Sequence, residues 1–300
     1  MIEAGQHEGQ SPDVKLMRLR YAGTCETCNA SLAAGTTAWY DRSRRKVRCP
    51  TCLPSAPEAV PCSSGTAGDS AAREYERRSE RHRQRVQAEL ADDAAWRTQV
   101  KQDHPVLGGV VSFLTPKPVV GPEPQHVKAW KTGADGERKV GARLDAWAEA
   151  TGGRVLHDRR IPRSRANIDH IALNSEGVWI IDAKEYKGTV NFSGGIFTRP
   201  ELRVAGRQKT HLADAVRSQM DRVASALDAA AAGDGRPPVY GVLCFVGADW
   251  PLFGGTFTIK GITVAWPAAT VKLLTPNGRH NDPAALDRWA WVLAGAFPPA

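Results

Sequence analysis

Two short apolar runs around a turn form a regular hydrophobic pattern near the middle of the chain. Ile168 to Leu173 and Val178 to Ile181 flank the tetrapeptide Asn-Ser-Glu-Gly at 174–177. Apolar runs of this length around turn-forming residues are typical of a β-hairpin. We therefore expect two neighbouring antiparallel strands here.

Helical patterns occur before and after this hairpin in the chain, and a buried strand follows it. Apolar residues recur at helical spacing over Asp135 to Ala150 and over His211 to Ala231. Val239 to Val246 is continuously apolar, as in a strand buried on both faces. A tryptophan-rich helix is expected over Pro283 to Phe297. This alternation predicts an α/β domain with a central sheet.

Charged residues interrupt the hairpin where a buried strand should be apolar. Asp169 lies inside the first run, and Asp182 and Lys184 follow the second. The period of two along a strand places Asp182 and Lys184 on one face. Two carboxylates and an ammonium on neighbouring strands suit metal-assisted hydrolysis of a phosphodiester. A structural Asp–Lys salt bridge is the alternative.

Three motifs then resemble those of the nuclease-related domain (NERD), which is placed in the PD-(D/E)xK nuclease superfamily. The motifs are GERKV, NIDHI and IDAKEYKG, which occur in this order between Gly133 and Lys187. The resemblance extends over about residues 130–250. It implies a restriction-endonuclease-like fold, in which helices flank a mixed central sheet.

The resemblance also assigns roles to individual residues. The helix acid falls on Glu137, the metal-binding aspartate on Asp169 and the (D/E)xK pair on Asp182 and Lys184. Glu137, Asp169 and Asp182 would hold catalytic Mg²⁺ or Mn²⁺. A helix glutamine that supports the site would correspond to Gln219. Ile168 precedes Asp169 where the superfamily has proline, but no carboxylate is lost.

Four cysteines near the N-terminus have the spacing of a zinc site. Cys25-x-x-Cys28 and Cys49-x-x-Cys52 are separated by twenty residues, with two short strands, Thr36 to Asp41 and Arg45 to Arg48, expected between them. Two such knuckles complete a tetrahedral Cys₄ site. We predict a zinc-ribbon-like module over residues 14–53 that depends on structural zinc for folding.

Between the ribbon and the nuclease-like domain the sequence predicts three connecting segments. Residues 54–70 are rich in Pro, Ser, Gly and Ala and indicate a flexible linker. Residues 71–104 predict a charged helical spacer, with a coiled-coil homodimer seam as an alternative. Residues 105–132 form a connecting segment, and the nuclease-like domain with a C-terminal extension occupies 133–300.

Positive charge is concentrated in the ribbon. The chain carries a formal charge of +8, and residues 14–52 contain eight Lys and Arg against two acids. Concentrated basic charge is typical of a nucleic-acid contact, although a solvated surface is the alternative. The residues expected to contact nucleic acid, with DNA as the expected form, are Arg42, Arg44, Arg45, Arg48, Arg163 and Arg165.

The chain has no run of eighteen apolar residues and no apolar leader at its N-terminus, so we expect a cytoplasmic protein without a membrane partner.

The expected function is divalent-metal-dependent hydrolysis of phosphodiester bonds, with DNA as the expected substrate. The alternatives are a non-catalytic nucleic-acid-binding module and a protein-interaction scaffold, each with a vestigial nuclease site.

Overall fold

The computed structural model describes residues 14–42, 44–49, 52, 64–105, 107–118, 121–194, 200–231, 235–251, 255–275 and 281–300. Residues 54–63, which form most of the predicted linker, therefore lie outside the described residues. The chain divides into two compact units. One comprises the chain up to Gly68 and from Gly136 onward, and the other comprises Asp69 to Asp135.

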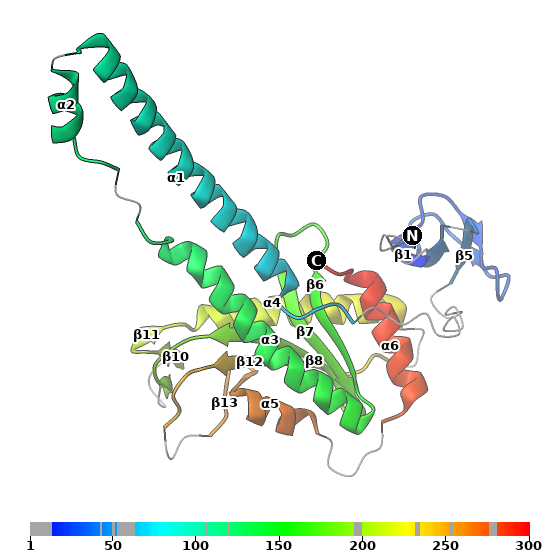
Figure 1. Cartoon of the computed structure of the whole chain (residues 1–300). Coiled ribbons are helices and arrows are strands. Elements are labelled where there is room, and N and C mark those ends of the chain that lie inside the picture. The colour runs from blue at the N-terminus through cyan, green and yellow to red at the C-terminus, as the bar shows by residue number, and fades with distance from the viewer. Residues whose placement is uncertain are drawn as a thin grey trace, which may run out of the picture. The chain divides into compact units, whose positions relative to one another are not determined.

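A six-stranded mixed sheet forms the centre of the first unit (Figure 1). Its strand order is β13–β14–β12–β8–β7–β6. Within this sheet β6, β7 and β8 are antiparallel to their neighbours along the chain, whereas β12 is parallel to both β8 and β14. The strands are β6 (Arg154–Arg160), β7 (Asn167–Asn174), β8 (Gly177–Glu185), β12 (Val239–Val246), β13 (Phe257–Ile259) and β14 (Ile262–Ala265).

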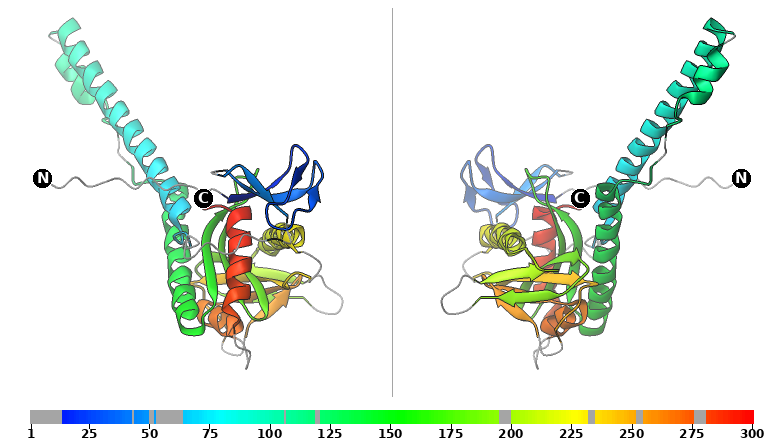
Figure 2. Two further views of the ribbon diagram at one scale, coloured as in Figure 1. Left: turned by 90° about the vertical axis from the view of Figure 1, so that its right-hand side faces the viewer. Right: turned by 90° about the vertical axis from the view of Figure 1, so that its left-hand side faces the viewer.

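Helices cover both faces of this sheet, as the turned views in Figure 2 show. On one face, α3 (Gln125–Thr151) and α5 (Pro267–Leu274) bury residues such as Leu144 and Leu274. On the other, α4 (His211–Ala230) and α6 (Pro283–Ala296) bury residues such as Val216 and Leu293. The mixed sheet between helices confirms the predicted α/β fold and is consistent with the nuclease-like fold.

The predicted hairpin is present as β7 and β8, and Asn174 fixes its turn. The Asn174 Oδ1 atom accepts hydrogen bonds from the backbone N–H groups of Glu176 and Gly177 and from the indole of Trp179. A side chain that binds the turn's own backbone is the usual role of asparagine in turns. The register that follows pairs Asn174 with Gly177 and His170 with Ile181.

Three smaller sheets complete the first unit. The ribbon contains a three-stranded sheet in the order β1–β4–β5 and a two-stranded sheet, β2–β3. A second three-stranded sheet, in the order β11–β10–β9, follows β8 in the chain. The bounds are β1 (Val14–Arg18), β2 (Gly23–Thr24), β3 (Ser31–Leu32), β4 (Thr37–Asp41), β5 (Lys46–Arg48), β9 (Val190–Ser193), β10 (Glu201–Val204) and β11 (Arg207–Gln208).

The C-terminal end of the predicted linker lies against the central sheet. The backbone N–H of His157 in β6 donates to Ser64 O. Gly65 has φ +74°, and a Cβ there would meet the His157 carbonyl at 2.3 Å, so glycine is required for this approach. Residues 64–68 are therefore fixed to the nuclease-like domain.

The second unit is a helical hairpin. Its long helix, α1 (Asp69–Asp103), carries ion pairs along its length, among them Glu74 with Arg78 and Glu80 with Arg83. The short helix α2 (Gly108–Leu114) packs on α1, where the guanidinium of Arg97 donates to the carbonyls of Ser112 and Thr115.

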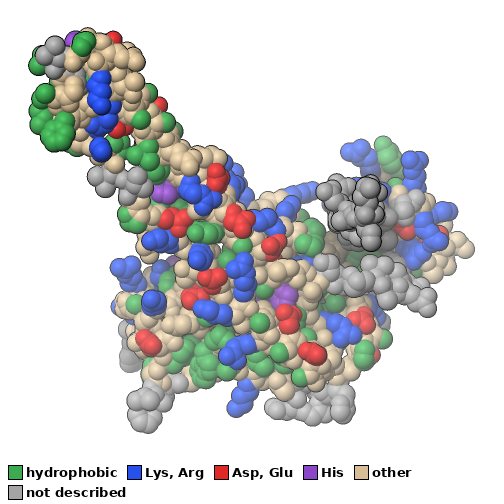
Figure 3. Space-filling view, in the orientation of Figure 1, with side chains coloured by type: hydrophobic (Ala, Val, Ile, Leu, Met, Phe, Trp, Pro, Cys, Tyr) green, Lys and Arg blue, Asp and Glu red, His purple; other side chains and the backbone are tan. Residues whose placement is uncertain are grey.

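Apolar side chains are exposed on this hairpin. Phe113 and Leu114 of α2 are 86% and 72% exposed. Figure 3 shows hydrophobic side chains gathered at its tip, and mixed charges along α1. Leu90 and Trp96 of α1 are also exposed. Dimerisation through residues 71–104 stays a prediction.

The helix that carries Glu137 is longer than the sequence suggests. It begins at Gln125, ten residues before the predicted start at Asp135. Glu137 consequently lies in the helix interior, and not in the first turn, where a start at Asp135 would place it. Gly133 and Gly136 both lie within this helix, and Gly136 is needed for packing. A Cβ on Gly136 would lie 3.0 Å from the Glu185 Cβ, so glycine lets α3 approach the end of β8 closely.

Candidate functional site

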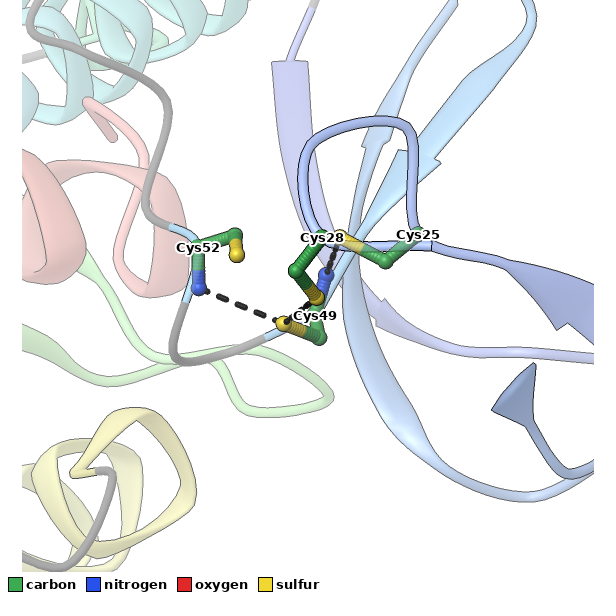
Figure 4. A group of neighbouring side chains, drawn as sticks. All are labelled: Cys25, Cys28, Cys49 and Cys52. Carbon is green, nitrogen blue, oxygen red and sulfur yellow. Dashed lines mark hydrogen bonds between the residues drawn. The ribbon is translucent and has the colours of Figure 1, made fainter. Parts of the chain in front are cut away.

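The four predicted zinc ligands come together in the ribbon, as Figure 4 shows. One ligand atom of each of Cys25, Cys28, Cys49 and Cys52 lies within 4.8 Å of the others. The Sγ atoms of Cys28 and Cys49 are 3.6 Å apart. Tight turns build both knuckles: the Asn29 N–H donates to Cys25 O, and the Cys52 N–H donates to Cys49 Sγ. This cluster could hold a metal such as zinc.

The electrostatics of the cluster also suit a cation. Burial opposes ionisation of Cys25, but backbone N–H groups of Cys28, Cys49 and Thr27 outweigh it and lower the pKa of this thiol to about 6. Hydrogen bonds to the Cys28 and Cys49 sulfurs raise the pKa of Cys52 to about 12. Four thiolates so close together would repel one another, and a tetrahedral Zn²⁺ removes that repulsion.

The protein purified without added metal is expected to contain one zinc per chain. Replacing the four cysteines by serine should remove that zinc and unfold the ribbon, because the metal supplies about 10 kcal/mol or more of its folding free energy. Elemental analysis and limited proteolysis measure the two effects. Undiminished zinc in the fourfold variant would contradict the assignment.

The second group of predicted site residues lies where β7 begins and β8 ends. His170 pairs with Ile181, so Asp169 lies across from Asp182 one residue further along the hairpin. Lys184 Nζ is 2.7 Å from Asp182 Oδ2 and 3.8 Å from Asp169 Oδ2. Asp169 Oδ2 also accepts a 2.9 Å hydrogen bond from the Ala183 N–H. The expected shared face of Asp182 and Lys184 is therefore present.

Burial and crowding of negative charge shift the pKa values of these acids. Burial, followed by the charges of Asp169 and Asp158, raises the pKa of Glu137 to about 9. Burial also raises the pKa of Asp169 to about 7, although Lys184 opposes the shift. Burial alone would lower the pKa of Lys184, but Asp169 and Asp182 outweigh it and raise it. The charges of Asp169, Asp182 and Lys184 therefore all act on Glu137.

This carboxylate group is a suitable but loose donor set for Mg²⁺ or Mn²⁺. Hard cations take carboxylate oxygens, and burial, with a contribution from neighbouring carboxylates, raises the pKa values of Glu137 and Asp169. Among the described residues, the four cysteines are the only group of three or more His, Cys, Asp or Glu side chains close enough together to hold a metal ion. The carboxylates would have to approach one another to share a cation.

The substitution Glu137→Gln should stabilise the metal-free protein increasingly as the pH rises. The folded-state pKa of about 9 exceeds the ordinary 4.5, so between these values the folded protein keeps a proton that the unfolded chain releases. That difference lowers the stability of the parent with rising pH. We expect Glu137→Gln to gain on the order of 1 kcal/mol at pH 8 and nothing at pH 4.

Thermal unfolding in EDTA at the two pH values measures this gain. Glu149→Gln is the matched control, because Glu149 is an exposed acid on the same helix. An equal shift in both variants at pH 8 would refute the raised pKa of Glu137.

Asp158 is a site residue that sequence reasoning missed. It is only 4% exposed and has φ +47°, an uncommon conformation for a residue other than glycine. It lies between the pairs His157–His170 and Arg159–Ile168, which places it across from Asp169. Its charge acts on both Glu137 and Asp169. Extending the predicted strand from His157 to Arg160 and pairing it with the first hairpin strand would have placed Asp158 opposite Asp169.

Two polar side chains connect Asp158 and α4 to the start of β7. The Asn167 side-chain amide donates to Asp158 Oδ1 at 3.1 Å. Gln219 Nε2 donates to the backbone oxygen of Asn167 at 3.4 Å. Gln219 is 8% exposed, so it is not an ordinary surface glutamine. Through this hydrogen bond Gln219 contacts Asn167, which lies two residues before Asp169 in the chain. This contact would let Gln219 support the start of β7, and it does not place Gln219 as a metal ligand.

The predicted nucleic-acid contacts have different surroundings. Arg42, Arg44 and Arg45 are exposed on the ribbon, whereas Arg48 pairs with Glu26 at 3.2 Å. Arg163 and Arg165 are exposed in the loop between β6 and β7. All these side chains except Arg48 are open to solvent, and their contact with nucleic acid stays a prediction.

His170 faces away from the carboxylates, because adjacent residues on a strand point to opposite faces of the sheet and His170 directly follows Asp169. Its Nδ1 lies 2.8 Å from His157 Nδ1, and His157 Nε2 lies 2.9 Å from Asp145 Oδ1. Burial lowers the pKa of His170 strongly, so it is a neutral residue of the core on the α3 face.

The sheet with helices on both faces is consistent with a nuclease-like fold, and the charged hairpin residues lie at the end of two of its strands. Residues 132–246 match the family model described as the nuclease-related domain, NERD. This match confirms the resemblance for the segment that contains Glu137, Asp169, Asp182, Lys184 and Gln219. No curated protein and no solved structure matches the chain. No described helix is long and apolar enough to cross a membrane.

Proposed function

We propose that this protein is a divalent-metal-dependent nuclease that cleaves DNA. The observation that carries the proposal is the geometry at the end of the hairpin. Carboxylates from two adjacent strands, Asp169 and Asp182, converge on Lys184, and the charges of all three act on the half-buried acid Glu137. The nuclease-related match over 132–246 supports this function.

Each residue would have a distinct role. Asp169 and Asp182 would hold the cation, and Glu137 would contribute a third carboxylate. A bound Mg²⁺ or Mn²⁺ would neutralise charge on the phosphate and activate the attacking water. Lys184 would move from its carboxylate contacts to the phosphate oxygens and stabilise the charge that develops there. Gln219 would fix the start of β7, and with it the position of Asp169.

Substrate binding would rely on exposed arginines. Arg163 and Arg165 lie in the loop that leads into β7, six and four residues before Asp169 in the chain. Arginine recognises phosphate through a planar fork of donors. The ribbon arginines Arg42, Arg44 and Arg45 would add sequence-independent affinity for the DNA backbone.

A substrate panel tests this proposal. Duplex DNA, single-stranded DNA, RNA and a DNA–RNA hybrid would be incubated with the protein in Mg²⁺, in Mn²⁺ and in EDTA. We expect cleavage of DNA in the presence of either cation and none in EDTA. Cleavage of RNA alone would contradict the substrate, and equal cleavage in EDTA would contradict metal dependence.

Ribbon removal should weaken binding without changing the chemistry. A chain that begins at Ala71 lacks the ribbon's eight basic residues, so fewer counterions are released on binding. We expect weaker DNA binding and a shallower dependence of log K on log salt concentration. Fluorescence anisotropy at several salt concentrations measures the slope, and identical slopes would exclude the ribbon from the DNA contact.

A non-catalytic nucleic-acid-binding module is the second candidate. The contact that favours it is the 2.7 Å pair between Lys184 and Asp182, which lets the protein's own ammonium neutralise the site. In that case the protein would bind nucleic acid but not Mn²⁺. A calorimetric Mn²⁺ titration separates the two candidates.

A further inference from the structure

Three polar side chains form a row across the small sheet that follows the site hairpin. Arg203 in β10 is the cross-strand partner of Asn191 in β9 and of Gln208 in β11. Residues directly opposite one another on antiparallel strands point to the same face. All three are exposed. The outer face of this sheet therefore presents an Asn–Arg–Gln row to solvent.

The other face of the sheet is anchored in the core. Val190, Leu202 and Val204 are at most 1% exposed and belong to the main hydrophobic cluster. Backbone hydrogen bonds join Val190 N to Asp249 O and Lys209 N to Leu202 O. Because the apolar face is buried, a one-residue slip of a strand is strongly disfavoured, and the row keeps its orientation.

Arginine, asparagine and glutamine are the side chains that read base edges in DNA. Arginine donates two hydrogen bonds to guanine, and asparagine or glutamine forms a bidentate pair with adenine. Strands are about 4.8 Å apart, so three strands span about 10 Å, comparable with the major groove width of about 12 Å. Arg203 is already oriented by Glu201 at 3.2 Å and by the Gly206 carbonyl at 3.3 Å.

The surroundings of the row suit a DNA backbone. Among the described residues from 186 to 211, four are Lys or Arg (Lys187, Arg203, Arg207 and Lys209) and one is acidic, Glu201. Asn191 follows Lys184 by seven residues, which span at most about 24 Å of extended chain. At about 3.4 Å per base pair, the row can contact bases within about seven pairs of the cleaved bond.

We propose that the β9–β10–β11 sheet reads base edges in the major groove of duplex DNA and gives the enzyme a sequence preference close to its cleavage position. Asn191 and Gln208 select adenine, and Arg203 selects guanine. This proposal rests on the proposed nuclease function and adds to it a specificity-determining surface.

Selection from random duplexes tests the proposal independently of cleavage. The full-length protein would be equilibrated with a random-sequence duplex pool in EDTA, and bound DNA would be sequenced. We expect the parent to enrich a short motif. Asn191→Ala and Gln208→Ala should each lose roughly 5- to 100-fold discrimination at one A·T position. Their salt slopes should match the parent, because neither variant loses a phosphate-binding charge.

A substitution that changes the preferred base provides a stricter readout. Gln208→Glu replaces a donor–acceptor amide by an acceptor, so its position should shift from adenine toward cytosine, whose amino group donates. Misfolding cannot produce such a shift. Gln102→Ala, at an exposed glutamine of α1, is the matched control and should retain the parent motif.

The outcomes separate this proposal from the proposed function. A parent that enriches no motif, or a Gln208→Ala variant that keeps the full parent motif, would overturn the reading role. Preferential binding of single strands that is independent of the three side chains would overturn it as well. A protein that selects a motif but cuts no DNA in Mn²⁺ would retain this proposal and overturn the nuclease assignment.

Discussion

Replacing Asp169 or Asp182 by alanine is expected to abolish both Mn²⁺ binding and DNA cleavage. The two carboxylates lie across from one another on adjacent strands, and either one alone leaves the cation with too few protein oxygens. Cleavage should fall to background. Calorimetric Mn²⁺ titration and a cleavage assay on the same preparations measure the two losses.

Asp214→Ala is the matched control for these variants. Asp214 pairs with Lys260 at 2.7 Å, the same distance as between Asp182 and Lys184, but this pair is exposed. We expect the control to bind Mn²⁺ and to cleave like the parent. In EDTA at pH 8, Asp169→Ala should be at least as stable as the parent, because repulsion between buried carboxylates is relieved. Normal Mn²⁺ affinity in Asp182→Ala would refute the ligand assignment.

Replacing Lys184 by alanine should separate metal binding from chemistry. The ammonium lies 2.7 Å from Asp182 and competes with a cation for its carboxylate, so the variant should bind Mn²⁺ as well as the parent or slightly better. Cleavage should nevertheless fall by about 10²-fold or more, the usual effect of removing one group that stabilises the transition state. Lys260→Ala, from the exposed pair with Asp214, should have neither effect.

Parent-level cleavage by Lys184→Ala would exclude a catalytic role for the lysine. Loss of Mn²⁺ binding in this variant would show that Lys184 maintains the site's structure. These two results distinguish the proposed role of Lys184 from a purely structural ion pair.

Features determined by short-range pattern were predictable from the sequence. The strand at Val239–Val246 has the predicted bounds, and α4 ends one residue from its predicted end. Paired CxxC motifs predicted the cysteine cluster, because each tight turn fixes two thiols and only one long-range contact is needed. The hairpin likewise positions Asp169, Asp182 and Lys184 through one turn and a period of two.

Features that depend on contacts distant in the chain were not predictable. Glycines at 133 and 136 weaken the helical pattern of α3, and the need for glycine at 136 follows only from the close approach of Glu185, which is distant in the chain. In the sequence alone, Asp158 begins an arginine-rich segment that is typical of a loop. Its burial depends on pairing between β6 and β7 and on the Asn167 side chain. Likewise, the Asn191–Arg203–Gln208 row forms only through the register of three strands.

Metal-dependent cleavage by the parent protein tests the central claim most directly. Supercoiled plasmid would be incubated with the parent, Asp169→Ala and Asp214→Ala, each with Mn²⁺ and with EDTA. The proposed mechanism predicts nicked or linear DNA with the parent and with Asp214→Ala in Mn²⁺ only, and intact plasmid with Asp169→Ala. Intact plasmid in all samples, or equal cleavage by the parent and Asp169→Ala, would contradict a nuclease site at the end of this hairpin.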